Sequence, residues 1–284
     1  MSVVHWNGRL VPEGEVRVSP FDRGLLLGDA VFETLRAYDG RPFNLDGHLA
    51  RLAASCAHAR LPFPEGLPEA VRATIDANGL AGADAAVRIT VTRGPGGRGA
   101  SPKGAGPPTV LVTATPVAVP PWTYERGLRL ATARRRKTPA ASLDPAVKST
   151  NYLVHVLARA EAEEAGADDA LFLDEDDLVV EATQANVLAV TRGRLETPPL
   201  SSGCLPGETR AILLRLAPQA GLEARERALC VTDLLEADEV LLCASVTEVA
   251  PAVELDGVAL GGGKPGPWAR ALHGLYRKHA RDRT

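Results

Sequence analysis

The stretch DPAVKSTNYL, residues 144–153, contains one lysine among small and polar residues, and a lysine amine can do chemistry. Lysine is ordinarily a solvated surface residue, so Lys148 acquires a chemical meaning only from the rest of the chain. An amine whose pKa is lowered by burial or by positive neighbours can form a Schiff base with a carbonyl compound. We expect a helix over Thr150–Ala165, with Lys148 at its leading edge and Tyr152 one turn further, facing the same pocket.

Glu181 ends an apolar strand that we expect over Leu178–Ala182, within the sequence VVEATQANVL. A lone carboxylate is costly to bury without a partner, and a protonated pyridine nitrogen would be such a partner. A strand-end glutamate in contact with water is the ordinary alternative. Glu181 is therefore a candidate only in combination with other residues.

Two element ends offer hydrogen-bond donors to an anion. Residues 207–209 begin a helix expected over 207–220, so their N–H groups and the Thr209 hydroxyl suit a phosphate. The strand expected over Val240–Ser245 ends in Ser245-Val246-Thr247, a second group of hydroxyls and amides. Helix capping and a strand-to-turn junction explain each equally well in isolation. Taken with the lysine and the carboxylate, the two groups describe the requirements of pyridoxal 5′-phosphate.

The composition excludes several classes of function. With 284 residues, 45% hydrophobic and 24% charged, the chain resembles a soluble globular protein of two modest domains. A net charge of −3 predicts no nucleic-acid partner. The 4 cysteines form no CxxC pair and the 6 histidines no HExxH motif, so we expect no metal site, no disulfide and a cytoplasmic location. The chain has no visible signal peptide and no apolar stretch of spanning length, which predicts no membrane contact.

Glycine-rich and serine motifs do not support other chemistries. Gly94–Gly99 follows a strand but opens a long loop, whereas a dinucleotide site needs a helix there. Gly261–Lys264 has no Ser or Thr after the lysine, so it is not a P-loop. Ser201–Cys204 lacks the GxSxG pattern of a nucleophile elbow. The basic run Arg134–Lys137 suits a solvated loop, with a site lined for anions as the alternative.

Helices and strands alternate in both halves without strict βαβ order, which predicts a mixed α/β (α+β) fold. The Asn7-Gly8 turn predicts a hairpin of Val3–Trp6 with Val16–Val18. Apolar spacing predicts helices over 46–59 and 67–78, and strands over 86–92 and 109–115. Two successive prolines cannot join a helix or a central strand. We therefore expect an N-terminal domain over 1–117, a linker over 118–121 and a C-terminal cofactor-binding domain over 122–284.

The chain resembles the class IV (fold type IV) pyridoxal-phosphate aminotransferases, which include branched-chain and D-amino-acid aminotransferases and aminodeoxychorismate lyase. The resemblance covers nearly the whole chain through five motifs in the family's order: FDRGLLLGDAVFETLRAYDGRPFNLDGHLARL, VKSTNYLVHVLARAEAEEAG, VVEATQANVLAV, LPGETR and SVTEVAP. It implies a smaller N-terminal α/β domain, a larger C-terminal domain with a barrel-like sheet, and a homodimer with its site between the domains.

The resemblance also implies roles for individual residues. Lys148 would hold the cofactor as a Schiff base, Glu181 would pair with the pyridine nitrogen, and Tyr152 would hydrogen-bond the phenolic oxygen. The phosphate would be held by Arg51, Glu208, Thr209, Ser245 and Val246. Substrate contacts would come from Phe32, Arg36, Arg88 and Arg98, the last from a loop that contacts the site of the neighbouring subunit.

The identity of the substrate stays open between members of the family. Arg36 and Arg88 match arginines near the substrate pocket of branched-chain enzymes, which favours an L-amino donor and a 2-oxo acid acceptor. A D-amino donor is an alternative, although Phe32 stands where those enzymes have a tyrosine and Arg98-Gly99-Ala100 lacks their histidine. The loop RGPGGRG is similar to that of aminodeoxychorismate lyase, which releases pyruvate and 4-aminobenzoate. Transamination is our main prediction and the lyase reaction its alternative.

Overall fold

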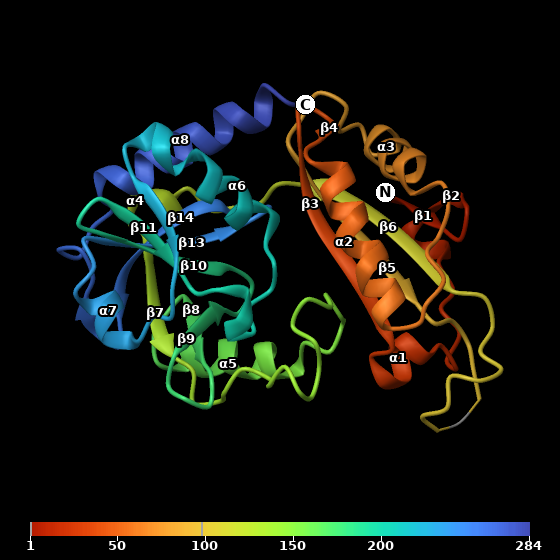
Figure 1. The fold of residues 1–284 in the computed structure, drawn as a ribbon. Helices are drawn as coiled ribbons and strands as arrows, with labels where there is room; N and C mark the ends of the chain where they lie inside the picture. Colours follow the sequence, from red (N-terminus) through yellow and green to blue (C-terminus); the bar gives the residue numbers. More distant parts are fainter. Residues whose placement is uncertain (1, 98) are drawn as a thin grey trace. The chain divides into compact units, whose positions relative to one another are not determined.

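The computed structural model describes residues 2–97 and 99–284, and within it the chain forms two compact units (Figure 1). The first unit contains the chain up to Ala118, and two short segments, Val147–Asn151 and Ala280–Thr284, return to it. The second unit contains Val119–Ala146 and Tyr152–His279. Lys148 therefore belongs to the first unit, although the chain on both sides of its segment belongs to the second.

The first unit is built on an antiparallel six-stranded sheet in the order β2-β1-β6-β5-β3-β4. Its strands are β1 (Val3–Trp6), β2 (Arg9–Pro12), β3 (Ala30–Tyr38), β4 (Arg41–Pro42), β5 (Ala85–Thr92) and β6 (Thr109–Pro116). The expected return strand at Val16–Val18 is wrong, because β2 follows the turn at once. Asn7 and Gly8 both have positive φ, 46° and 91°, and such two-residue turns reverse a strand immediately.

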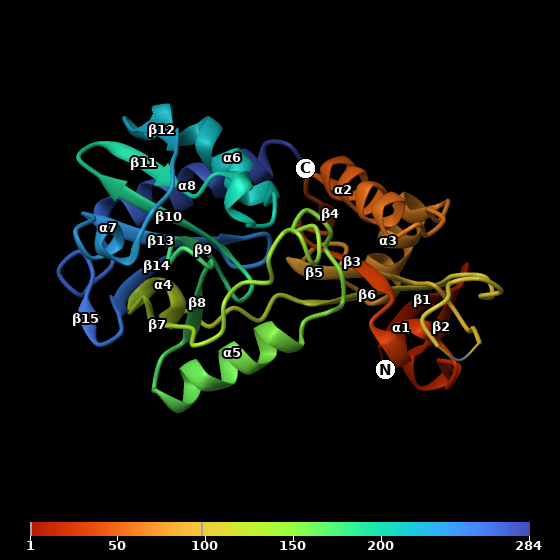
Figure 2. The same cartoon turned by 60° about the horizontal axis from the view of Figure 1, so that its bottom comes forward.

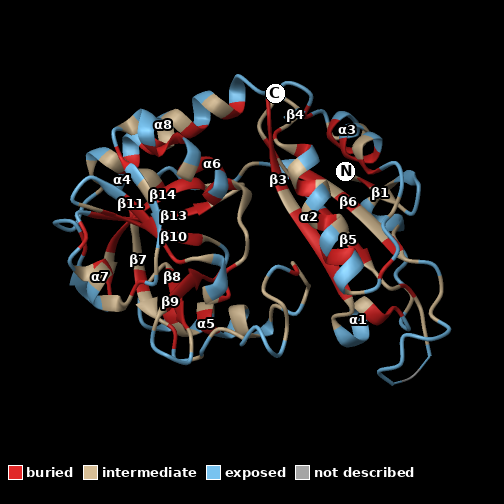
Figure 3. Cartoon of the chain, in the orientation of Figure 1, coloured by how far each residue is buried: buried red, intermediate tan, exposed pale blue. Residues whose placement is uncertain are grey.

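Two helices, α2 (Leu45–His58) and α3 (Leu67–Ala77), cover one face of this sheet (Figure 2). Their sheet-facing residues, such as Leu52 and Ile75, are buried in one apolar cluster with Leu35 of β3, while the opposite helix faces are exposed (Figure 3). The apolar spacing that predicted both helices reflects this one-sided burial. The unit also contains η1 (Glu13–Glu15) and α1 (Arg23–Leu27).

The segment 147–151 pairs with the open edge of β3 instead of beginning a helix. The N–H of Phe32 donates to the Lys148 carbonyl at 2.9 Å, and the N–H of Thr150 donates to the Ala30 carbonyl at 3.0 Å. The Thr150 hydroxyl also donates to the Gly28 carbonyl. The expected helix start at Thr150 is therefore wrong: α5 begins at Leu153, and pairing with β3 outweighs the local helical pattern.

The second unit contains a nine-stranded mixed sheet in the order β12-β11-β10-β13-β14-β7-β8-β9, with β15 beside β14. Its strands are β7 (Leu128–Thr132), β8 (Asp169–Leu173), β9 (Val179–Ala182), β10 (Asn186–Thr191), β11 (Arg194–Thr197), β12 (Glu223–Glu226), β13 (Glu239–Ala244), β14 (Glu248–Leu255) and β15 (Val258–Ala259). A tight turn, with the Ala182 N–H donating to the Ala185 carbonyl, turns the chain from β9 into β10. The sheet curves into a half-barrel, which confirms the predicted mixed fold with a barrel-like second sheet.

Helices pack around this curved sheet: α4 (Trp122–Glu125), α5 (Leu153–Glu164), α6 (Glu208–Leu216), α7 (Val231–Leu235) and α8 (Pro267–Arg281), with η2 (Leu200–Ser202) and η3 (Ala217–Ala220). The sheet interior is apolar, with Leu171, Val187 and Leu242 buried in one cluster. Among residues 2–97 and 99–284, no helix combines the length and apolar character needed to span a membrane.

Candidate active site

Lys148 is held by its peptide group on two sides. Its carbonyl accepts from β3, and its N–H donates to the Ser55 hydroxyl of α2 at 3.2 Å. The Lys148 ammonium is half-buried and lies 4.6 Å from the centroid of the Phe32 ring, within reach of a cation–π interaction. The lysine is therefore anchored at the edge of a sheet, with its amine beside an aromatic face.

Arg51 lies on α2 one turn before Ser55, the residue that anchors Lys148. Its guanidinium makes a bidentate ion pair with Glu33 of β3, at 2.6 and 2.8 Å, and His48 contacts the same carboxylate at 2.8 Å. Burial raises the pKa of Glu33, but the hydrogen bonds from Arg51 and His48 outweigh it and hold that pKa at about 2. A permanent carboxylate thus fixes the orientation of Arg51.

Three predicted substrate residues share the face of the sheet opposite α2. Phe32 and Arg36 have the same parity on β3, and Arg88 of β5 stands opposite Thr34 in the register. The Arg88 guanidinium lies 3.8 Å from the Phe32 ring centroid, and Arg88 is exposed. Arg36 is buried and paired with Asp84 at 2.7 Å, toward the other end of the strand. Arg88 thus lies beside Phe32, whereas the Arg36 charge is balanced within the sheet.

Arg98 lies outside the described residues, but the backbone beyond it is anchored by Arg23 at the start of α1. The buried Arg23 guanidinium donates to the carbonyls of Gly99 and Ala100, at 3.0 and 3.1 Å, and pairs with Asp29 at 3.0 Å. A Cβ on Gly96 would approach the Arg23 side chain to 2.7 Å. Arg23 therefore positions this loop, a role that sequence reasoning missed although the residue stands inside the first family motif.

Glu181 is the central carboxylate of the second unit. It lies on β9, is 5% exposed, and its Oε1 is 2.6 Å from the Lys137 Nζ. Its Oε2 accepts from the Leu205 N–H at 3.1 Å and from the Asn186 amide at 3.4 Å. The alternative of a solvated strand-end glutamate is therefore wrong, since the carboxylate is buried and paired.

The beginning of α6 approaches this carboxylate through Asn186. The Asn186 amide donates to the Leu205 carbonyl at 2.9 Å, and a Cβ on Gly207 would lie 1.9 Å from the Asn186 Oδ1. The N-cap of α6 is Gly207, which has no side chain to cap the helix, and the first N–H groups of any helix lack an acceptor inside the helix. The Thr209 hydroxyl is buried and lies 3.3 Å from the Tyr276 hydroxyl of α8.

Ser245 and Val246 form the turn between β13 and β14, together with Thr247. Asn186 of β10 pairs with Cys243 of β13, and the turn begins two residues after Cys243. The Thr247 carbonyl accepts from the Tyr124 hydroxyl at 3.0 Å, which fixes the turn. Glu181, the beginning of α6 and this turn therefore meet at one end of the second sheet.

Tyr152 precedes the first residue of α5 and stacks on His155, with ring centroids 4.5 Å apart. His155 in turn lies edge-on to Phe172 of β8 at 5.0 Å, and Phe172 stands opposite Glu181 in the register. Tyr152 is thus connected to the neighbourhood of Glu181 through His155. Lys148 belongs to the first unit and Tyr152 to the second, and the predicted helix over Thr150–Ala165 begins only at Leu153.

In the first unit Phe32, Arg88 and Lys148 lie together, whereas Arg51 is on α2, at the opposite face of the sheet. The predicted residues of the second unit are Tyr152, Glu181, Glu208, Thr209, Ser245 and Val246. Sequence reasoning missed their buried partners Glu33, His48 and Asn186, and the half-buried His155. Among the partners of the predicted residues, only Lys137 was noted in the sequence, as the last residue of the basic run Arg134–Lys137.

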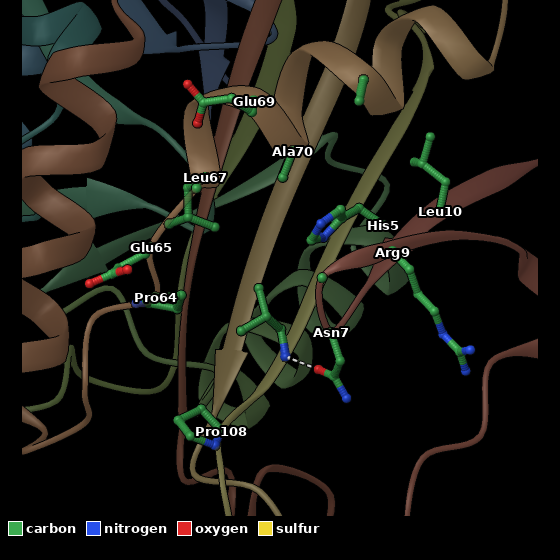
Figure 4. A pocket seen from close by; sticks show the side chains of 14 residues that line it. His5, Asn7, Arg9, Leu10, Pro64, Glu65, Leu67, Glu69, Ala70 and Pro108 are labelled. Atoms are coloured by element: carbon green, nitrogen blue, oxygen red, sulfur yellow. Dashed lines mark hydrogen bonds between the residues drawn. The ribbon is translucent and has the colours of Figure 1, made fainter.

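A separate groove of about 580 Å³ lies in the first unit between the first hairpin and the beginning of α3 (Figure 4). His5, Arg9 and Glu69 are among the side chains that line it, and the Asn7 amide accepts from the Val110 N–H at 2.8 Å. None of the predicted site residues in the described chain lines this groove. It is therefore distinct from the group around Lys148.

The amino-acid sequence is similar to those of known proteins over nearly its whole length. The chain is 40% identical over 277 residues to the "Putative branched-chain-amino-acid aminotransferase" of Methanocaldococcus jannaschii, covering 96% of this chain and 95% of that protein. It is 35% identical to the D-alanine aminotransferase of Bacillus licheniformis, covering 93% and 92% of the two chains. It is 30% identical to the aminodeoxychorismate lyase of Bacillus subtilis (strain 168), covering 99% and 95%.

Solved structures agree with these relatives. The branched-chain amino acid aminotransferase of Thermobaculum terrenum, in its PLP-bound holo-form, superposes with a TM-score of 0.87 at 30% identity, covering 100% of this chain and 95% of that chain. The profile of the family described as amino-transferase class IV matches residues 30–255. That match spans β3 to β14 and includes every predicted site residue. The chain therefore belongs to the class IV aminotransferase family.

Proposed function

We propose that the protein moves an amino group between an amino acid and a 2-oxo acid, using pyridoxal 5′-phosphate attached to Lys148. The observation that carries the proposal is the setting of Lys148. Its peptide group is fixed to β3 and Ser55, and its amine lies against the Phe32 ring. Two cationic side chains, Lys148 and Arg88, contact this one ring.

The second unit offers groups that fit the rest of the cofactor. Glu181 is a buried carboxylate, which suits a protonated ring nitrogen. Helix α6 begins directly after Gly207, and the N–H groups at the beginning of a helix bind phosphate. The close approach of Gly207 to Asn186 links these two features. When bound, the cofactor supplies an aldehyde for attachment to an amine and a protonated ring that accepts electrons from the substrate Cα.

The chain's own residues then have distinct tasks. Lys148 Nζ would hold the cofactor, and the same amine, when free, would serve as the general base at the substrate Cα. Glu181 would pair with the ring nitrogen, and the Tyr152 hydroxyl would donate to the phenolic oxygen. The phosphate would be held by Arg51, Glu208, Thr209, Ser245 and Val246. Glu33 keeps the Arg51 guanidinium in place for this contact.

The substrate we propose is a branched-chain L-amino acid, with a 2-oxo acid as acceptor. The M. jannaschii relative supports this choice by its name. Arg88 is exposed beside Phe32 and suits a substrate carboxylate, and the predictions for Arg36 and Arg98 remain proposals of the same kind. A D-amino donor is the variant of this proposal that the D-alanine aminotransferase relative supports.

The test mixes the cofactor-loaded protein separately with L-leucine, L-glutamate, D-alanine and D-glutamate, and records absorption spectra. We expect L-leucine to convert the bound cofactor to pyridoxamine phosphate and release the 2-oxo acid. Borohydride reduction followed by peptide mass mapping should fix the cofactor to Lys148, and Lys148→Ala should show neither result. If borohydride fixes nothing to Lys148 in the loaded protein, the proposal fails.

A second candidate is the release of pyruvate and 4-aminobenzoate from aminodeoxychorismate, which the B. subtilis relative favours. The same lysine would hold the cofactor in both reactions. Formation of 4-aminobenzoate by the unmodified protein, lost in Lys148→Ala, without conversion of any amino acid would favour the lyase.

We also propose a homodimer located in the cytoplasm. Four exposed apolar side chains lie together in and before α1, namely Phe21, Leu25, Leu26 and Leu27, and Leu25 is 66% exposed. A contiguous apolar group of this kind on a protein surface marks a contact surface. A double charge substitution, Leu25→Glu with Leu26→Glu, should convert a dimer to a monomer in light scattering. The cysteines are all free, which suits a reducing compartment.

A further inference from the structure

Lys137, the last residue of the basic run, is turned away from the solvent that surrounds its neighbours. Its side chain is 13% exposed, whereas those of Arg135 and Arg136 are 40% and 43% exposed and pair with Glu161 and Asp177. The Lys137 N–H donates to the Leu173 carbonyl at 2.9 Å, at the end of β8. One member of a basic run is therefore directed inward, toward Glu181.

The Lys137 ammonium lies between a carboxylate and an imidazole. It is 2.6 Å from the Glu181 Oε1, 3.2 Å from the His155 Nε2 and 5.8 Å from the Phe172 ring centroid. An ammonium has only donors, so the Glu181 carboxylate and the His155 Nε2 must both accept from it. A compact ammonium in this position is a point charge that can be shared between two acceptors.

The contacts of His155 assign its protonation. Its Nδ1 lies 2.7 Å from the Thr183 carbonyl, which can only accept, so Nδ1 carries a proton. Its Nε2 faces the Lys137 ammonium, which can only donate, so Nε2 carries none. His155 is therefore the neutral Nδ1–H tautomer, and its ring is fixed at both nitrogens. The Tyr152 ring stacks on this fixed imidazole at 4.5 Å.

The Glu181 carboxylate retains an acceptor position in this arrangement. An ionised carboxylate offers about four lone-pair positions. Within the described part of the chain, Lys137 uses one on Oε1, and Leu205 and Asn186 use two on Oε2. The remaining position lies on Oε1, the oxygen that Lys137 contacts, so this lysine sets the direction in which that oxygen faces.

We propose that Lys137 is a positioning residue that holds the Glu181 carboxylate oriented for the cofactor's ring nitrogen, and through His155 fixes the ring of Tyr152. This inference rests on the proposed function of the same site. It replaces both explanations of the basic run for this one residue, since Lys137 is neither a solvated loop residue nor a contact for a substrate anion. The anion that this lysine binds is a carboxylate of the protein itself.

The experiment compares Lys137→Met with Lys137→Arg, and uses Arg135→Met as a matched control from the same run. Cofactor dissociation constants are measured by titration of the cofactor-free protein, together with the absorption band of the bound cofactor. We expect Lys137→Met to raise the dissociation constant about 10–100-fold, the usual cost of removing a charged partner behind a ligand, and to shift the band. Lys137→Arg should restore much of the affinity, and Arg135→Met should change neither readout.

A double variant distinguishes a positioning role from a general loss of structure. If Lys137 acts on the ring through Glu181, its substitution should add little to the change in dissociation constant once Glu181→Gln is present. Equal effects of Lys137→Met in both backgrounds, or an unchanged band in Lys137→Met, would overturn the inference. Borohydride labelling of Lys148 in the unmodified protein is followed in parallel. Its failure would reject the proposed function itself, whereas labelling with an unaltered Lys137→Met rejects only the role of Lys137.

Discussion

Glu33 of the first unit and Glu181 of the second are both buried strand glutamates held by a cation, and the shape of that cation differs. The Arg51 guanidinium engages both oxygens of Glu33, and His48 adds a third contact. The Lys137 ammonium engages only one oxygen of Glu181, and the other oxygen has the neutral donors Leu205 and Asn186. Both oxygens of Glu33 contact a cationic side chain, whereas only one oxygen of Glu181 does.

This difference indicates two different tasks. A bidentate arginine makes a rigid pair, so Glu33 serves to fix Arg51 and takes no part in chemistry. A lysine is a point charge that leaves the rest of the carboxylate accessible, so Glu181 can accept a further cationic donor. Substitution of Glu33 should therefore mainly change stability, and substitution of Glu181 should mainly change catalysis.

The largest effect is expected from Glu181→Gln. The amide cannot stabilise a proton on the ring nitrogen, so turnover with the best amino donor should fall about 10²–10³-fold, as when one charge-stabilising group is removed from an active site. The thermal midpoint should change little by comparison with Glu33→Gln. Steady-state kinetics on the loaded enzyme measures the effect, and turnover near that of the unmodified protein would remove Glu181 from the chemistry.

Glu33→Gln should mainly destabilise the first unit. It leaves the half-buried Arg51 and the buried His48 without their anion, and breaking a buried ion pair costs about 3–5 kcal/mol. Denaturant unfolding followed by circular dichroism measures the loss, which should exceed that of Glu181→Gln. The reverse order of stabilities would contradict the assignment of tasks.

Acidification should affect Glu33 in a defined window. Its pKa in the folded protein is about 2, below the ordinary value of 4.5, so the unfolded chain takes up the proton first. The contribution of this group to the free energy of unfolding, about 3 kcal/mol, is therefore complete above pH 4.5 and lost as the pH falls toward 2. Unfolding free energies measured across this range should decline less steeply in Glu33→Gln; an unchanged slope would show that other groups govern acid stability.

A smaller effect is expected from Gly207→Ala in the second unit. The added Cβ would lie 1.9 Å from the Asn186 Oδ1, so Asn186 must move away from Glu181 and Leu205. Overpacking of this kind costs about 1–3 kcal/mol, and cofactor affinity should fall with it. Gly274→Ala in α8 is the matched control, because its Cβ would meet nothing within 4 Å. Equal cofactor affinity in the two variants would show that Asn186 does not orient Glu181.

The sequence predicted the helices α2, α3 and α6 because each buries one face, and one-sided burial leaves a periodic pattern. It failed at two places where pairing decides the structure. The return strand β2 was expected later in the chain, and the segment around Lys148 was expected to be helical. In both places the observed hydrogen bonds join the segment to a strand, and local spacing does not encode that partner.

The candidate residues could be found from sequence because their types are unusual for their positions and recur in family motifs. Their partners could not. Arg51 and Glu33, or Lys137 and Glu181, are far apart in the chain, and each looks like an ordinary surface charge when read alone. In the folded protein the nitrogen and oxygen of each pair lie 2.6 Å apart. Whether the cation is an arginine or a lysine affects the carboxylate only at this distance.

The two returning segments of the first unit have a consequence for synthesis. Residues 147–151 complete the edge of β3, and within 280–284 Arg281 pairs with Asp39 of the turn before β4 at 2.6 Å. A ribosome that has released only residues 1–118 therefore presents an unpaired strand edge, which invites association with other chains. Arrest of translation between residues 118 and 147 should yield a nascent chain that depends on chaperones, and the dependence should end once the segment of Lys148 emerges.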